Sequence, residues 1–437
     1  MGLVSILFPR SGVNIGSIHL IFPPLDEIFF DKKPQYADIT SIVVEQNISD
    51  EQEKKIKRVK IKADNIVNIE FPNEESTYLD SFFSSLNKIA TDNNVVRVIH
   101  YGDSQIEGDR ITSYLRARLQ GMFGGDGRGE IPLYSRSNIK NITFSYSDSC
   151  QFYSIIHNKR TLFRNYGLMQ SVVVCVKDTS FITIHFDKKT VANMTLYCKS
   201  NSPMSHINIL NGESILTTLH INNSEGLSAQ KINNNTIVKS LTFQIIGNVD
   251  LYSLDFSDTK GIYVDNVPLR GCSGNGFTKN NPEFLASMSK KLNVKLLILQ
   301  FGVNAVPQDE QQVVPSYNYY KVQLRKEINF LKKSNPDAAI IIVSVSDRSR
   351  KKGTHYETNP NIPKILSIQK QVAKECGVAF WNLYEAMGGK NSMPSWVLRE
   401  RPLANPDFIH FNNIGAKYVG EMFYKALENA YYDYQER

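Results

Sequence analysis

The sequence has few cysteines and only two tryptophans, and it contains no long hydrophobic run. Its five cysteines are odd in number and widely spread over 437 residues, with no CxxC pair or Cys/His cluster. We therefore expect no structural zinc site, although one disulfide such as Cys175–Cys198 would be compatible with an oxidising compartment. No apolar run approaches the roughly 18–20 residues of a membrane-spanning helix, so we expect no stable membrane span in this chain.

The charge balance is only mildly basic. Fifty Lys and Arg residues stand against 43 Asp and Glu, which gives a formal net charge of +7. The longest basic run, residues 54–62, is interrupted by apolar residues and is typical of an edge strand or a solvated face. We therefore expect no nucleic-acid partner. A hydrophobic content of 41% and an aromatic content of 11% exclude a largely disordered chain.

Residues 1–75 give no clear pattern, and we treat them as an N-terminal extension. The first eight residues form a short apolar stub without a basic segment in front of it. Two interpretations stay open for this stub: the remnant of a trimmed signal or anchor, or a plain strand.

The pattern becomes clear from residue 76 onwards. Apolar residues recur every three or four positions over 78–89, which predicts an amphipathic helix begun by Ser76 or Thr77. The β-branched run 95–101 predicts a buried strand, and a polar helix is expected from Gln105 to about Gln120.

The segment 136–262 has a different texture. Short apolar runs alternate with Asn, Ser, Asp and Gly turns about every ten residues, without helical periodicity. Strands are expected at 171–176, 181–186, 194–198, 206–210, 214–221 and 241–246. This spacing predicts an antiparallel β-sandwich or jelly-roll domain.

The segment 263–437 returns to alternating helices and strands. Helices are expected near 282–292, 313–333, 363–375 and 413–430, and strands at 295–300, 339–345 and 378–382. Such alternation predicts an α/β fold with a central parallel sheet covered by helices on both faces. The expected architecture is one α/β domain made of 76–135 and 263–437, with the β domain 136–262 inserted after its first βα unit.

Four polar residues lie just after strands or just before the last helix, where open α/β sheets bind ligands. Ser104 could act as a nucleophile and His410 as its general base, since imidazole changes charge near neutral pH. Asp407 could hold the other ring nitrogen. The side chain of Asn304 could bind an oxyanion together with the backbone N–H groups of Ser104 and Gly274. Taken alone, each short string that holds one of these residues usually forms a turn. Only the joint occurrence of these strings at strand ends indicates nucleophilic catalysis.

Two other glycine-rich segments are weaker candidates. Ser273 lies in a Gly-Cys-Ser-Gly string that lacks the glycine spacing of a nucleophile elbow. The loop 124–129 has no Gly-Lys-Ser/Thr after it, so we expect a flexible loop that rims the site rather than a phosphate cradle. The remaining histidines show no metal-ligand spacing, and neither a metal nor a cofactor is predicted.

Four blocks of the chain, in this order, resemble the SGNH or GDSL-type hydrolase superfamily. They are Tyr101–Gln105, Gly271–Asn275, Gly302–Ala305 and Asp407–His410. The resemblance covers roughly 76–130 and 262–430. It implies a three-layer α/β/α sandwich, the triad Ser104, Asp407 and His410, and an oxyanion hole of Ser104, Gly274 and Asn304. Ala305 replaces the acidic residue usual after the asparagine.

The separation of 170 positions between Ser104 and Gly274 exceeds the usual family spacing, and the inserted β domain accounts for the excess. A β-sandwich similar to a carbohydrate-binding module at this place resembles bacterial peptidoglycan O-acetylesterases. The resemblance implies a periplasmic or secreted serine esterase, with tethering through a trimmed N-terminus as a variant, that removes acetyl groups from a carbohydrate. An O-acetyltransferase with the same triad and a non-catalytic glycan-binding protein stay open as alternatives. The β domain could also simply form one wall of the substrate-binding cleft, without binding a glycan.

Overall fold

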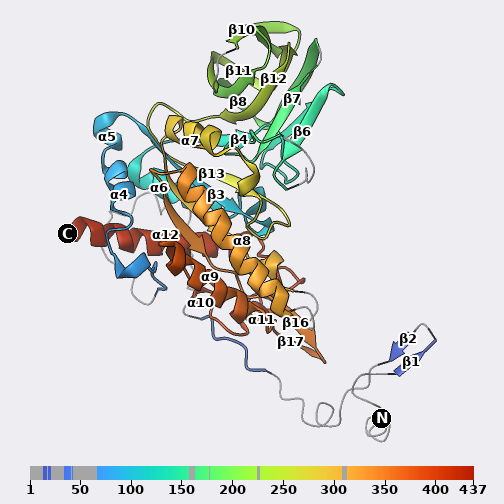
Figure 1. Ribbon diagram of the computed structural model, residues 1–437, viewed down its shortest axis with the longest axis vertical. Helices are drawn as coiled ribbons and strands as arrows, with labels where there is room; N and C mark the ends of the chain where they lie inside the picture. The colour runs from blue at the N-terminus through green and yellow to red at the C-terminus, as the bar shows by residue number, and fades with distance from the viewer. Residues whose placement is uncertain are drawn as a thin grey trace, which may run out of the picture.

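The structure is a computed structural model. It consists mainly of an α/β body and an antiparallel β body. It describes residues 13–16, 18–20, 34–40, 42, 66–156, 163–176, 178–223, 227–307 and 313–437. The stub 1–8 and the basic run 54–62 lie outside the described residues. Figure 1 shows an α/β body below, an antiparallel β body above, and to one side the small hairpin of β1 (Val13–Ile15) and β2 (Ile18–Leu20).

A five-stranded parallel sheet forms the centre of the α/β body. In spatial order its strands are β13 (Gly261–Pro268), β3 (Val95–Gly102), β14 (Val294–Gln300), β15 (Ala339–Val343) and β18 (Ala379–Trp381). The edge strand β13 was not expected from the sequence. Its apolar run is cut short by Asp265 and Asn266, so it lacks the continuous hydrophobic pattern of a buried parallel strand.

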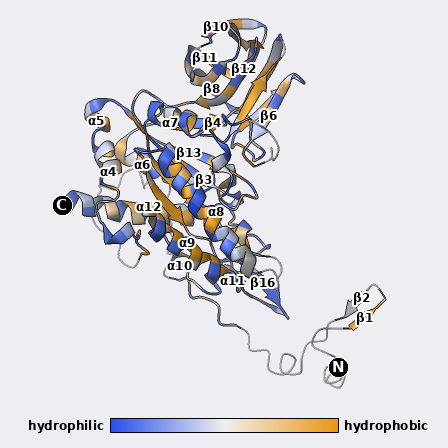
Figure 2. Cartoon of the chain, viewed as in Figure 1, coloured by the Kyte–Doolittle hydropathy of each residue, from blue (hydrophilic) through white to orange (hydrophobic). Residues whose placement is uncertain are grey.

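Helices cover both faces of this sheet and form two separate cores. Successive residues of β3 point to opposite faces, so Val96 and Val98 belong to one core while Ile99 and Tyr101 belong to the other. The first core packs against α4 (Asp80–Asn87), α6 (Thr112–Phe123), α10 (Leu383–Ala386), α11 (Ser392–Leu398) and α12 (Asn413–Glu436). The second core packs against α7 (Pro282–Lys291), α8 (Val313–Ser334) and α9 (Ile362–Cys376). Figure 2 shows the hydrophobic stretches on the strands between these helices. The predicted three-layer α/β/α sandwich is confirmed.

The antiparallel body is a two-layered β-sandwich built on two long bent strands. The strands β8 (Thr179–Ser200) and β11 (Ser228–Ile246) pair with each other in both layers. One layer adds β5 (Ile142–Tyr146), β9 (Met204–Asn211) and β10 (Ser214–Asn222). The other adds β4 (Glu130–Pro132), β6 (Cys150–Ser154), β7 (Ser171–Cys175) and β12 (Val249–Asp255). A single buried apolar core lies between the layers, as the inserted sandwich predicted from the sequence requires.

The expected strands 181–186 and 194–198 are two halves of β8 rather than separate strands. The sequence predicts a turn at the charged stretch between them. Instead, register shifts at Asn234/Ile237 and Val238/Ser240 of β11 let the strand pair bend without breaking, as β-bulges do.

A buried ionic cluster joins the two sheets. Arg97 of β3 donates from Nη1 to Asp265 of β13, at 2.8 Å, and from Nη2 to Asp255 of β12, at 2.6 Å. Glu130 of β4 lies beside them and accepts from Ser253. The domain division at 135/136 and 262/263 stays a prediction. The described pairing places β4 in the antiparallel sheet and β13 in the parallel one.

Several helix boundaries differ from expectation. The helix expected to begin at Ser76 or Thr77 begins at Asp80, and a short continuation, α5 (Ile89–Asp92), follows it. The last helix runs on to Glu436 rather than ending near residue 430. Within the described ranges, none of the helices combines the length and the apolarity required to cross a membrane.

Candidate active site

The turn after β3 carries Ser104 to the carboxyl edge of the parallel sheet. The strand ends at Gly102, where a Cβ atom would lie 3.0 Å from the carbonyl oxygen of Gln300 and 2.9 Å from Cδ1 of Ile106. Only glycine allows the ends of β3 and β14 to approach this closely. The side chain of Asp103 then accepts the backbone N–H of Gln105, at 2.9 Å, and closes the turn around Ser104.

The segment after Ser104 differs from the long helix expected from Gln105. A short 3₁₀ helix η2 (Ser104–Asp109) comes first, and α6 begins only at Thr112. Glu107 is extended and Gly108 has a φ of +68°, so a continuous helix is impossible here. Ser104 therefore does not stand at the first turn of a long helix, so the dipole of a long helix does not act directly on an oxyanion at this place.

The loop before α12 carries Asp407 and His410. One carboxylate oxygen of Asp407 accepts the backbone N–H groups of Ile409, at 2.9 Å, and His410, at 3.0 Å. Phe408 between them has a φ of +57°, which is unfavourable for a bulky residue. Its ring stacks on Tyr356 of β17 (His355–Thr358), with the ring centroids 3.6 Å apart, and this stack holds the loop in place.

The fold brings Ser104, His410 and Asp407 into one hydrogen-bonded chain. Ser104 Oγ lies 2.8 Å from His410 Nε2, and His410 Nδ1 lies 2.7 Å from Asp407 Oδ2. The side chains of His410 and Asp407 are 32% and 43% exposed, so a substrate can reach the site from solvent. Burial raises the pKa of Asp407, but the hydrogen bonds from His410 and Ile409 outweigh it and lower the pKa below its ordinary value. Asp407 is thus an anion suited to a protonated Nδ1, which leaves Nε2 free to accept the Ser104 proton.

Two side chains from η2 and the residue after it tie the serine turn to the histidine loop, and sequence reasoning assigned them no role. Gln105 Nε2 donates to the carbonyl of Ile409, at 2.8 Å, and Gln105 Oε1 accepts from the N–H of Phe411, at 3.2 Å. Arg110 Nη2 donates to the carbonyl of Ser104, at 2.7 Å, and Nη1 to that of Phe411, at 2.6 Å. The position of Gln105, directly after the candidate nucleophile, was the available signal.

Asn304 and Gly274 lie on neighbouring loops at the same edge of the sheet. Asn304 is in the 3₁₀ turn η4 (Val303–Ala305) that follows β14, and its Nδ2 donates to the carbonyl of Cys272, at 3.1 Å. The N–H of Gly274 points to Cys272 Sγ, at 3.3 Å. Both candidate oxyanion donors therefore contact Cys272, a buried residue that the sequence did not single out. An oxyanion would compete for these N–H groups with the present acceptors, the sulfur and the carbonyl oxygen of Cys272.

Asp103 is a second buried group that sequence reasoning left without a role. Burial raises its pKa to about 7, against the lowering effect of hydrogen bonds from Gln105 and Asn304.

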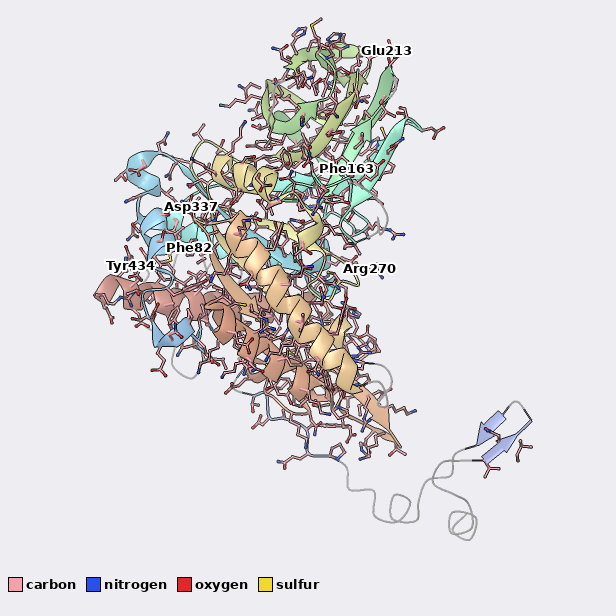
Figure 3. The ribbon with its side chains drawn as sticks, in the orientation of Figure 1. Phe82, Phe163, Glu213, Arg270, Asp337 and Tyr434 are labelled. Carbon is pink, nitrogen blue, oxygen red and sulfur yellow. The ribbon has the colours of Figure 1, made fainter. Side chains whose placement is uncertain are left out.

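The glycine-rich loop 124–129 does not rim the site, contrary to expectation. Gly125 packs against Ile262, near the start of β13, and Gly261 pairs with Val95 at the start of β3. Because α6 runs back from Ser104, the loop that follows it lies at the opposite, amino-terminal edge of the sheet. Arg270 lies nearer the site: its Nη1 is 3.5 Å from Glu107, and Figure 3 shows it on the flank of the α/β body beneath the antiparallel body.

Among the residues that the structure describes, no group of three or more His, Cys, Asp or Glu side chains gathers in a way that could hold a metal ion.

Comparison with known proteins identifies the second part of the α/β body. Residues 250–418 match the profile of the GDSL-like lipase/acylhydrolase family. This segment contains Gly274, Asn304, Asp407 and His410, whereas Ser104 lies before it, on the other side of the inserted domain. A comparison with curated proteins gives no match.

The chain also matches solved structures that are described as esterases. A structure described as a peptidoglycan O-acetylesterase in action is 19% identical, with a TM-score of 0.65, and the match covers 81% of this chain and 96% of that chain. An acetyl xylan esterase, AlAXEase, is 15% identical over 38% of this chain and 81% of its own, with a TM-score of 0.30. A family two carbohydrate esterase from Cellvibrio japonicus is 12% identical over 55% and 87%, with a TM-score of 0.20.

The first of these similarities extends over most of the chain and confirms the fold, and the family profile accounts for the segment that holds the histidine and the asparagine. Residues 250–418, which hold Gly274, Asn304, Asp407 and His410, therefore resemble the GDSL-like lipase/acylhydrolase family.

Proposed function

We propose that this chain is a serine esterase that removes O-acetyl groups from a carbohydrate of the cell envelope or of the extracellular space. The observation that carries the proposal is the hydrogen-bonded chain from Ser104 Oγ through His410 to Asp407, with distances of 2.8 and 2.7 Å. This arrangement lets a serine hydroxyl lose its proton as it attacks a carbonyl carbon.

In the first half of the proposed reaction, Ser104 Oγ bonds to the ester carbonyl carbon and its proton passes to His410 Nε2. The carbonyl oxygen becomes an oxyanion, which the N–H groups of Ser104 and Gly274 and the side-chain amide of Asn304 bind. Asp407 stabilises the positive imidazolium. The tetrahedral intermediate then collapses, the bond to the sugar oxygen breaks, and His410 returns the proton to that oxygen, which leaves an acetyl-Ser104 ester.

In the second half, water replaces the sugar. His410 takes a proton from the water as its oxygen attacks the acetyl carbon, and the same three donors bind the second oxyanion. The bond to Ser104 Oγ breaks, acetic acid leaves, and Ser104 recovers its proton from His410. A sugar hydroxyl in place of water would make the same site a transferase.

The carbohydrate part of the proposal rests on the match to the peptidoglycan O-acetylesterase structure, which covers nearly all of that chain. The match covers 81% of this chain, which is more than the α/β body alone contains. On the same ground we place the enzyme in the periplasm or outside the cell, where polysaccharides that carry acetyl groups are found.

Hydrolysis of phenyl acetate, butyrate and octanoate by the purified protein tests the chemistry. We expect acetate to be the best substrate and activity to vanish in Ser104→Ala while Ser287→Ala, an exposed serine of α7, keeps it. Activity that survives Ser104→Ala would refute the triad. Release of acetate from an acetylated glycan, with and without an added sugar acceptor, then separates hydrolysis from transfer.

A further inference from the structure

A pocket of about 400 Å³ opens beside the candidate oxyanion hole, between the loops at Gly274 and Asn304 and the first turns of α8. Its described lining consists of Ser273, Gly274, Asn275, Asn304, Ala305, Tyr319, Tyr320, Gln323 and Leu324. None of these residues carries a charge. Because Gly274 and Asn304 are part of the wall, whatever fills the pocket lies next to the reacting carbonyl.

The volume of the pocket exceeds the needs of an acetyl group. Pockets of roughly 300–1,000 Å³ hold small organic molecules, whereas an acetyl group contributes only three heavy atoms. The pocket is therefore suited to a larger part of the substrate, and in an acetylated glycan that part is a sugar ring.

The lining matches the chemistry of a sugar ring rather than that of a long acyl chain. Tyr319 is 62% exposed, and its ring offers an aromatic surface to the C–H face of a pyranose. Ser273, Asn275 and Gln323 offer a hydroxyl and two amides, which both donate and accept hydrogen bonds as sugar hydroxyls do. A long hydrocarbon chain would cover these polar groups without pairing them, which is unfavourable.

The floor of the pocket is buried and held by hydrogen bonds. Tyr320 and Leu324 are buried, and the hydroxyl of Tyr320 accepts from Nε2 of Gln369, at 3.0 Å. Gln369 is itself fixed, since its Nε2 also donates to the carbonyl of Phe301 and its Oε1 accepts from the N–H of Val345. A preformed pocket loses little conformational entropy when a ligand binds.

Ala305 explains the neutrality of the pocket. The family resemblance leads one to expect an acidic residue at this position, directly after Asn304. Here a methyl group lines the pocket instead, which leaves space and removes a negative charge from the wall.

We propose that this pocket is a subsite for an uncharged sugar ring of the ester substrate, with Tyr319 as its stacking surface. The proposal rests on the proposed esterase function and specifies its substrate: the ring that occupies this subsite carries no carboxylate.

The test is a comparison of two substrates in the variant Tyr319→Ala. We expect kcat/KM for an O-acetylated chitooligosaccharide to fall at least tenfold, mainly through KM, and kcat/KM for phenyl acetate to stay within twofold. The matched control is Val322→Ala, which removes a half-exposed side chain of the same helix that does not line the pocket. It should leave both substrates unchanged.

A second variant probes the charge. Ala305→Asp should weaken turnover of the neutral glycan, because the new carboxylate occupies the wall of the pocket.

Equal losses on glycan and phenyl acetate in Tyr319→Ala would overturn the subsite. A loss confined to phenyl octanoate would overturn it as well and would indicate an acyl-chain pocket.

The subsite and the catalytic proposal can fail separately. If wild type hydrolyses no ester, the esterase proposal fails. The subsite is then tested by titration calorimetry with the same chitooligosaccharide without its O-acetyl groups. Wild type should bind this ligand, and Tyr319→Ala should bind it at least tenfold more weakly. Equal affinity of the two proteins would refute it.

Discussion

The side-chain amide of Gln105 holds the backbone on both sides of His410. Its nitrogen donates to the carbonyl before the histidine and its oxygen accepts the N–H after it, at 2.8 and 3.2 Å. Because Gln105 is bonded to Ser104, the same amide sets the distance between nucleophile and base. Arg110 reinforces this link by binding the carbonyl of Ser104.

Replacing Gln105 with alanine should lower kcat roughly tenfold to a hundredfold and leave KM nearly unchanged. The histidine loop would lose both contacts to the serine turn, and displacements of about 1 Å cost rates of this order. Steady-state kinetics with phenyl acetate measure the effect.

The matched control for this variant is Gln120→Ala, which removes a half-buried glutamine of α6 that donates to the carbonyl of Gly127 far from the site. It should keep wild-type kinetics. Gln105 does not position His410 if Gln105→Ala raises KM and leaves kcat unchanged. The same conclusion follows if Gln105→Ala and Gln120→Ala lose activity to the same extent.

Asn304→Ala should lower kcat by about 10²–10³, the usual loss when one oxyanion donor is removed. The variant also removes the hydrogen bond to the carbonyl of Cys272, so thermal melting must be recorded beside the kinetics. Unchanged turnover in a folded variant would exclude Asn304 from the mechanism.

Cys150 and Cys175 should form a disulfide under oxidising conditions. They lie directly opposite each other on β6 and β7, with the sulfur atoms 3.8 Å apart, whereas the sequence had suggested Cys175–Cys198 as a possible pair. The hydrogen bond from Cys175 lowers the pKa of Cys150 to about 7, which favours the reactive thiolate. Opposed residues of antiparallel strands have a Cα spacing within the disulfide range.

Peptide mapping by mass spectrometry after oxidation identifies the bridge. Its 25-residue loop predicts a stabilisation of about 3.5 kcal/mol, seen as a higher melting temperature of oxidised wild type. Cys198→Ser should retain this increase and Cys150→Ser should lose it. A bridge between Cys175 and Cys198 would contradict the assignment.

The buried cluster at the junction predicts a pH dependence of stability. Burial raises the pKa of Glu130 to about 8, although Arg97 opposes the shift. Between pH 4.5 and 8 the folded chain therefore holds a proton that the unfolded chain releases, and stability falls as pH rises, by up to about 1.4 kcal/mol per pH unit for one proton.

Glu130→Gln removes this titration and keeps the shape of the side chain. Melting temperatures from pH 5 to 8 should decline less steeply in Glu130→Gln than in wild type. Parallel curves for the two proteins would show that Glu130 is ionised in the folded state.

The sequence was most informative where periodicity and motif coincided. The strands around 95–101, 295–300 and 339–345 were recognised because parallel strands buried on both faces are continuously apolar. The strand β13 and the bend of β8 were missed, since polar residues interrupt both runs and only pairing with distant strands makes them regular. The helix expected from Gln105 is not formed because the extended Glu107 and the left-handed Gly108 and Asp109 redirect the chain.

By itself, the sequence determined which residues could perform the chemistry, because a serine, a histidine, an aspartate and an asparagine at strand ends are recognisable without coordinates. Tertiary structure decided their distances. Ser104 and His410 are 306 positions apart, and no local pattern specifies that their side chains meet at 2.8 Å. Three other features likewise depend on packing between segments remote in the chain, which sequence periodicity does not encode. They are the hydrogen bonds from Gln105 to the histidine loop, the Cys150–Cys175 pair and the pocket beside Asn304.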